Sequence, residues 1–238
     1  MDQEYLDKMA RATRIQNQAL AILQRARASG IPGEYLRIDK KTFRSYLDEQ
    51  FFKSRGQSAD KVADVIYDTP EYLFKRKFIL IDGGDKGGMI IKKAGFAILF
   101  RMIACDSSGI YRDGLELINK LKTGWVTDQG SRIDIADKLK NEELLYIDGL
   151  SYKHFRAGDK AYYEAGVFMD EILGHRLVNG LTTILSFDST IRKTDLPEVS
   201  DGICGNMLGR FFQADHESLA NLMKNEYKVS RIRVKEEK

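Results

Sequence analysis

A cluster of glycines directly after an apolar run is the part of the chain whose residue types could bind phosphate. The apolar run covers residues 78–81, and the glycines follow at Gly83, Gly84, Gly87 and Gly88. A mostly apolar, helix-like segment then runs from residue 89 to residue 104. A strand, a glycine loop and a helix in this order are typical of a P-loop, in which backbone N–H groups at the helix N-terminus hold a phosphate.

The side chains of this loop differ from those of a working P-loop, G-x-x-x-x-G-K-[ST]. Aligning Gly83 and Gly88 with the two outer glycines puts Met89 at the lysine position and Ile90 at the hydroxyl position. A displaced positive charge could come from Lys86, Lys92 or Lys93. Alternatively, the glycines only form a tight turn. The candidate residues for binding ATP or ADP, with Mg²⁺, are Gly83, Gly84, Asp85, Lys86, Gly87, Gly88, Met89 and Ile90.

A second candidate site residue is an acid that follows another apolar run. Residues 143–148 end in Asp148, and the carboxyl end of a parallel strand is where a Walker B aspartate holds Mg²⁺. Hydrolytic sites usually carry a second acid next, but here the residue is Gly149. Ser186 has neither a nucleophile elbow nor an evident histidine partner, so hydrolase chemistry based on a serine nucleophile is not expected.

The elements that must position these residues alternate between strands and helices. This alternation predicts an α/β fold with a parallel sheet flanked by helices, of the P-loop NTPase kind. The predicted strands are 77–82, 110–111, 143–148, 182–187 and a possible fifth at 210–213. The predicted helices are 42–53, 58–67, 89–104, 114–122 with Asp113 as N-cap, 131–140, 162–177, 196–207 and 218–227.

An N-terminal helical arm is predicted over residues 4–28, followed by Ser29, Gly30 and Pro32, which are typical of a helix end. Its apolar residues form one stripe. The stripe either packs on its own domain or docks on a partner. The predicted organisation is therefore an arm at 1–30, which is a candidate for partner docking, and one domain at 31–238 with a charged, basic tail from 229.

Composition narrows the class of protein. The 238 residues carry a net charge of only +3, so nucleic-acid binding would depend on local basic clusters, at 75–77 and 224–238. The two cysteines, without a signal peptide, favour a reducing, cytoplasmic compartment. No apolar run reaches the roughly 18 residues of a membrane helix, so no membrane contact is expected. The three histidines have no metal-ligand spacing.

Taken together, residues 31–213 resemble the AAA+ domain of DnaC/DnaI-type replicative helicase loaders and their IstB relatives. The resemblance rests on Ile31-Pro32 with Tyr35, the degenerate P-loop, the helix beginning Leu115-Glu116-Leu117-Ile118, and two strand motifs. Residues 144–150 are similar to the family's hydrophobic-Asp-Asp-Leu signature, and residues 182–188 are similar to its Thr-Ile-Ile-Thr-Ser-Asn sensor strand.

The resemblance implies a protein that uses ATP, Mg²⁺ and oligomer contacts to place a ring helicase on single-stranded DNA. Several of the implied catalytic positions are changed here. The sensor asparagine corresponds to Asp188, whose charge would repel a γ-phosphate, and the arginine finger corresponds to Gly202. An arginine finger alone can contribute several powers of ten in rate. We therefore expect a pseudo-ATPase that binds a replicative helicase, and a homo-oligomer is a candidate assembly.

Single-stranded DNA is a further expected partner. Trp125 falls in a predicted irregular loop at 122–130, with Lys120 and Lys122 nearby, and an aromatic flanked by cations is how proteins stack on single strands. The alternative is that Trp125 anchors a core or an interface. Two other functions also stay open: an active ATP-dependent loader or transposition helper with an atypical P-loop, and a regulatory subunit that caps an active AAA+ partner.

Overall fold

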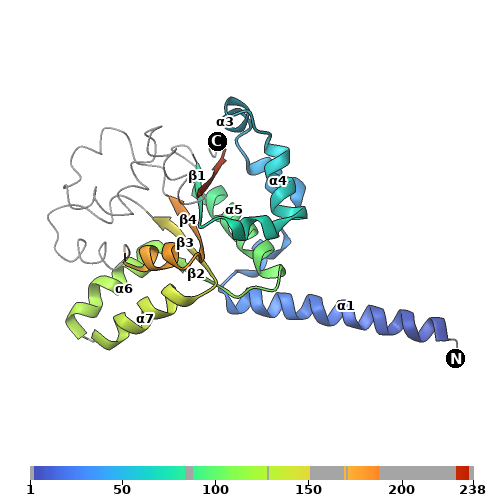
Figure 1. Cartoon of the computed structure of the whole chain (residues 1–238), viewed down its shortest axis with the longest axis horizontal. Coiled ribbons are helices and arrows are strands. Elements are labelled where there is room, and N and C mark those ends of the chain that lie inside the picture. Colours follow the sequence, from blue (N-terminus) through green and yellow to red (C-terminus); the bar gives the residue numbers. More distant parts are fainter. Residues whose placement is uncertain are drawn as a thin grey trace.

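A five-stranded parallel sheet forms the centre of the computed structural model, which describes residues 3–83, 88–127, 129–150, 169, 171–187 and 229–235. The strand order is β2-β3-β4-β1-β5, and every pairing is parallel (Figure 1). The strands are β1 (Phe78–Gly83), β2 (Gly109–Asp113), β3 (Leu144–Leu150), β4 (Thr182–Phe187) and β5 (Val229–Val234). The predicted α/β fold with a parallel sheet is confirmed.

The fifth strand lies where the sequence predicted a charged tail, so that prediction was wrong. Residues alternate along β5, and Ile232 and Val234 are buried. The arginines at 231 and 233 fall on the alternate positions, and charged residues are common on edge strands such as β5. The strand predicted at 210–213 and the helices predicted at 196–207 and 218–227 lie outside the described residues.

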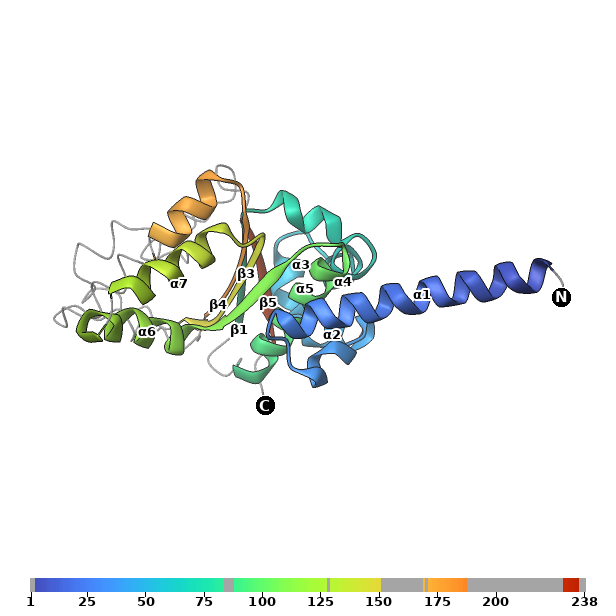
Figure 2. The ribbon, with the colours of Figure 1, turned by 90° about the horizontal axis from the view of Figure 1, so that it is seen from below.

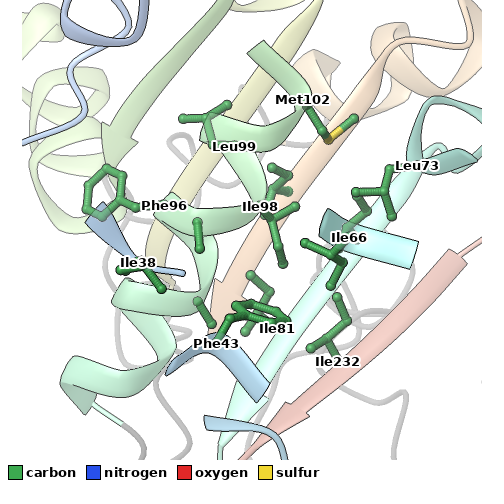
Figure 3. Close-up of a cluster of buried hydrophobic side chains, with 14 of the residues drawn as sticks. Ile38, Phe43, Ile66, Leu73, Ile81, Phe96, Ile98, Leu99, Met102 and Ile232 are labelled. Carbon is green, nitrogen blue, oxygen red and sulfur yellow. The ribbon is translucent and has the colours of Figure 1, made fainter. Parts of the chain in front are cut away.

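Helices cover both faces of the sheet, and each face has its own apolar core (Figure 2). One face packs against α5 (Gly88–Ala104), α2 (Lys40–Tyr46) and α4 (Ala59–Asp68). Figure 3 shows this core, where Ile81 of β1 and Ile232 of β5 lie near Phe43 and Ile98. The other face packs against α6 (Gly114–Thr127), α7 (Gln129–Asn141) and the helical residues 171–178.

The helix predicted at 42–53 is interrupted. It consists of α2 and α3 (Glu49–Ser54), with short 3-10 segments at Gly33–Arg37 and Pro70–Lys75 elsewhere in this region. Leu47 is buried at the break and forms an antiparallel bridge with Val234. Asp48 then caps α3 by accepting a hydrogen bond from the Phe51 N–H at 3.1 Å. The break therefore follows from contact with a strand 187 positions further along the chain, the difference between 234 and 47.

The predicted loop at 122–130 is also corrected. α6 continues through Thr127, so Trp125 lies within a helix, although the side chains of 122–133 are not described. α6 tolerates Gly124 because a glycine inside a helix costs only about 1 kcal/mol relative to alanine. The predicted start of this helix is confirmed, because Asp113 Oδ1 accepts a hydrogen bond from the Glu116 N–H at 3.0 Å.

The first helix, α1 (Gln3–Ala28), leaves the body of the protein as a long arm (Figure 2). Only its last turns pack on the domain: Ala26 is fully buried, and Ile22 and Leu23 are half-buried. Residues 7–21 are all exposed. Among the described helices, α1 included, none combines the length and apolarity that a membrane span needs.

A buried arginine fastens the amino-terminal edge of the sheet. Arg176 donates hydrogen bonds to the carbonyls of Leu139, Glu142 and Thr182 at 2.6–2.8 Å and to Thr183 Oγ1 at 2.8 Å. Burial lowers the pKa of Arg176 to about 10, which still leaves the guanidinium charged at neutral pH. One side chain thus ties the end of α7 to the beginning of β4, at the edge opposite Asp148.

Candidate functional site

The candidate site lies at the carboxyl edge of the sheet, where β1, β3 and β4 end. β1 ends at Gly83 and α5 begins at Gly88, so the strand and helix expected to flank a glycine loop are present. Residues 84–87, including Asp85 and Lys86, lie outside the described residues. Asp148 of β3 is at the same edge because all the strands are parallel. In parallel α/β sheets, ligands bind at this edge.

The carboxylate of Asp148 is buried and already hydrogen-bonded. Its Oδ1 atom accepts hydrogen bonds from the Tyr146 hydroxyl at 3.0 Å and the Ser186 hydroxyl at 2.5 Å. Ser186 Oγ in turn accepts a hydrogen bond from the Gly149 N–H at 3.0 Å. Burial and the Asp148 carboxylate raise the pKa of Tyr146 well above its ordinary value, so its hydroxyl remains a donor.

The other oxygen of Asp148 faces a lysine. Lys92 Nζ of α5 lies 3.3 Å from Asp148 Oδ2 and 5.6 Å from the ring centroid of Tyr111. Burial alone would lower the pKa of Lys92, but Tyr111 and the Asp148 carboxylate together raise it above the usual lysine value. Lys92 was one of three lysines that the sequence offered as a displaced P-loop charge. The structure brings it to Asp148 because side chains on a helix point back towards its N-terminus.

A glycine in α5 makes room for the tyrosine of this cluster. A Cβ atom at Gly95 would lie 2.1 Å from the hydroxyl oxygen of Tyr146 and 2.2 Å from its Cζ atom. Gly95 is therefore required for the Tyr146 ring to pass α5 and reach Asp148. Phe96, the next residue, packs edge-on against the same ring, with centroids 5.5 Å apart.

Gly149, the residue after Asp148, differs from the second acid of a hydrolytic site in backbone conformation as well as in side chain. Gly149 has φ +70°, in the left-handed region that favours glycine, and a register shift separates Ile147 from Leu150 in the β3–β4 pairing. An acid at position 149 would have to adopt this strained backbone or change it. The absence of a second acid thus goes together with a local backbone shape suited to glycine.

Aromatic side chains connect the segment after the arm to the start of α5. Met89 is half-exposed, and its sulfur accepts a hydrogen bond from the Tyr35 hydroxyl at 3.6 Å. The Tyr35 ring stacks on Phe96, with centroids 4.7 Å apart and 13° between the ring planes. Phe96 also packs against Tyr111. Aromatic contacts therefore connect the segment after the arm to the neighbourhood of Lys92 and Asp148.

With Lys92 in place, the described residues do not fit a Mg²⁺ ion at Asp148. Mg²⁺ needs near-octahedral oxygen ligands at about 2.0–2.1 Å, whereas the start of α5 offers Met89 and Ile90. A divalent ion about 4 Å from the Lys92 ammonium would be repelled by about 8 kcal/mol at an effective dielectric constant of 20. Over the described part of the chain, no group of three or more His, Cys, Asp or Glu residues could hold a metal ion.

The remaining predicted site residues are described only in part. Lys120 lies on α6 and forms an ion pair with Glu116 at 2.6 Å. The side chains of Lys122 and Trp125 are not described, and Asp188 and Gly202 lie outside the described residues. The sequence analysis did not assign Tyr146, Gly95 or Ser186 to the site. Of these, Tyr146 could have been found, because it lies two residues before Asp148 on the same face of β3.

The strand order, the helices on both faces and the glycine-loop position define an α/β fold of the AAA+ P-loop NTPase kind. The crystal structure of the DnaC helicase loader has a similar fold, with a TM-score of 0.51 and 17% identity over 84% of this chain and 99% of that chain. The predicted resemblance to DnaC/DnaI-type loaders is thus confirmed as a DnaC-like fold.

Two other solved structures match this chain with lower TM-scores. The crystal structure of DnaI matches with a TM-score of 0.44 and 15% identity, over 70% of this chain and 81% of that one. AMPPCP-bound DnaA from Aquifex aeolicus matches with a TM-score of 0.44 and 12% identity over 73% of this chain. The chain spans only 45% of that DnaA chain. No family model matches the sequence, and no curated protein matches it.

Proposed function

We propose that this protein is a DNA replication accessory protein that binds a ring helicase and acts through that contact, without turning over ATP. The observation that carries the proposal is the state of Asp148 within a DnaC-like fold. Its carboxylate, expected to hold a metal, is instead satisfied by Tyr146, Ser186 and Lys92. A protein that keeps the frame of a helicase loader but not its metal site would still retain surfaces for binding a partner.

The arm at residues 1–30 is the proposed helicase-docking element, and residues 31–238 form the proposed AAA+-like domain. The apolar stripe of α1 packs on the domain at Leu23 and Ala26, and it continues outward through Ile15 and Met9. Ile15 is 59% exposed and Met9 is 52% exposed, although the helix continues beyond both. An amphipathic helix commonly binds a partner by laying such a stripe in a groove.

The exposed part of the arm is long enough for such a contact. Residues 7–21 extend for about 20 Å at 1.5 Å per residue. Leu20, which is 50% exposed, lies on the same side of the helix as Met9, because a separation of eleven residues makes close to three turns. The arm therefore offers a continuous apolar strip, bordered by the charged residues of the opposite face.

Capture of a ring helicase by charge variants of the arm tests this proposal. The triple variant Met9→Glu, Ile15→Glu and Leu20→Glu should lose helicase capture while keeping the Tm of the domain, because all three residues are exposed. The matched control is the triple variant Ala10→Glu, Arg14→Gln and Ala21→Glu, which makes the same change in net charge on the opposite side of α1 and should retain capture. Undiminished capture by the triple variant would refute the docking role of the arm.

An active ATPase is a second candidate, and Lys92 is the observation that favours it. Its ammonium lies at the carboxyl edge of the sheet, near the start of α5, where a phosphate charge would need a cation. On this alternative, Lys92 would leave Asp148 and contact ATP. Phosphate release that depends on both Mg²⁺ and Lys92 would support it. Its absence in the presence of helicase and single-stranded DNA would support the contact-only function.

A further inference from the structure

The carboxylate of Asp148 requires a positive charge nearby, because a buried, ionised carboxylate is costly unless it is paired and hydrogen-bonded. Hydroxyl groups satisfy Oδ1, but they carry no charge. Within the described part of the chain, Lys92 is the cation in an ion pair with Asp148. Among the described residues, the charge balance of the site therefore depends on Lys92.

The position of Lys92 is fixed by rigid elements. The lysine lies in α5, which is packed against β1, β3 and β4 and is buried along much of its length. Its side chain is about one-third exposed, and its ammonium is close to the Tyr111 ring. Tyr111 lies on β2, next to β3, so the neighbours of the ammonium come from the sheet as well as the helix.

We propose that the ammonium of Lys92 replaces a divalent metal as the permanent counter-ion of Asp148, so that this site holds its shape and takes any ligand without Mg²⁺. An ammonium and a hydrated Mg²⁺ ion can each neutralise a carboxylate, but the two cations cannot occupy its free oxygen together. The hydroxyls of Tyr146 and Ser186 hold the other oxygen in either case. This inference concerns the site alone and does not depend on helicase docking.

Thermal unfolding in Mg²⁺ and in EDTA tests the exchange of one cation for the other. Lys92→Met removes the charge but keeps an apolar chain of similar length. We expect a fall in Tm of roughly 5–15 °C, because an uncompensated carboxylate remains buried. Millimolar Mg²⁺ should recover part of that loss, whereas Na⁺ at the same ionic strength should not. The double variant Lys92→Met/Asp148→Asn should be more stable than Lys92→Met and indifferent to Mg²⁺.

Two matched controls accompany this variant. Lys93→Met removes the same charge from the adjacent position of α5, and its Tm should be close to that of the wild type and equal in Mg²⁺ and EDTA. Lys92→Arg keeps the charge and should also be indifferent to Mg²⁺. If Lys92→Met does not fold, calorimetric titration of the wild-type protein with MgCl₂ alone still tests whether Mg²⁺ binds at Asp148.

Saturable binding of Mg²⁺ to the wild-type protein that is lost in Asp148→Asn would overturn the proposal. So would a Lys92→Met variant that loses stability but gains nothing from Mg²⁺, since Lys92 would then be an ordinary ion-pair partner. Helicase capture is measured in a separate experiment. A loss of the docking proposal would therefore leave the Mg²⁺ result unchanged, and a loss of the Lys92 proposal would leave the capture result unchanged.

Discussion

Replacing Gly95 with alanine should destabilise the protein, although the same change in an ordinary helix is stabilising. Alanine is favoured over glycine inside a helix by about 1 kcal/mol. At position 95, however, the new methyl group would lie 2.1 Å from the Tyr146 hydroxyl oxygen and 2.7 Å from its Cε1 atom. Non-bonded carbon contacts are favourable at about 3.5–4.0 Å, so the ring must move by more than an ångström.

The expected magnitude follows from two costs. Overpacking a core typically costs about 1–3 kcal/mol. Moving the Tyr146 hydroxyl also breaks its hydrogen bond to Asp148, and hydrogen bonds to charged groups contribute about 1.5–3 kcal/mol. After subtracting the helix preference for alanine, we expect Gly95→Ala to lower the free energy of unfolding by about 2–4 kcal/mol.

Urea unfolding followed by circular dichroism measures this change, with two companion variants. Gly88→Ala is the matched control at the first residue of α5, because a Cβ there meets no atom within 4 Å. Its stability should be unchanged or slightly increased. Tyr146→Leu shortens the obstructing side chain, so Gly95→Ala should cost at least about 1 kcal/mol less in that background than alone.

The reasoning fails if Gly95→Ala is as stable as the wild type or more stable. It also fails if the effects of Gly95→Ala and Tyr146→Leu simply add. Either result would mean that the Tyr146 ring does not pass α5 at Gly95, and the placement of its hydroxyl on Asp148 would then lose its main support.

Three further predictions concern other parts of the chain. Arg176→Met should cost about 3–5 kcal/mol in urea unfolding, because it leaves buried carbonyl groups without donors. Gly149→Glu should cost about 1–2 kcal/mol because of its positive φ and should not create phosphate release, whereas Gly33→Ala, in open space, should be near neutral. Trp125→Ala should weaken binding of fluorescent single-stranded DNA by about 1–3 kcal/mol, and Lys120→Gln should reduce its salt dependence.

Most of the sheet could be predicted from the sequence because its strands are short apolar runs bounded by polar or glycine residues. β1, β3 and β4 were predicted within a few residues of their observed ends. β5 was missed because its two arginines made a strand look like a charged tail, and its role depends on pairing with β1. Local sequence contains no information on that pairing.

The candidate site was predicted only in part for a similar reason. Asp148 was recognisable as an acid at the end of an apolar strand. Its partnership with Ser186 depends on the pairing of β3 and β4, and its partnership with Lys92 depends on how α5 packs on the sheet. Sequence alone left three lysines as equal candidates. The buried Arg176 gave no signal because an arginine on an amphipathic helix is normally exposed.

Calorimetric titration of the wild-type protein with ATP, once in Mg²⁺ and once in EDTA, tests the central claim most directly. The account predicts that the two isotherms coincide, because Lys92 already neutralises Asp148 and no metal is needed there. Tight ATP binding that appears only with Mg²⁺ and disappears in Asp148→Asn would contradict it.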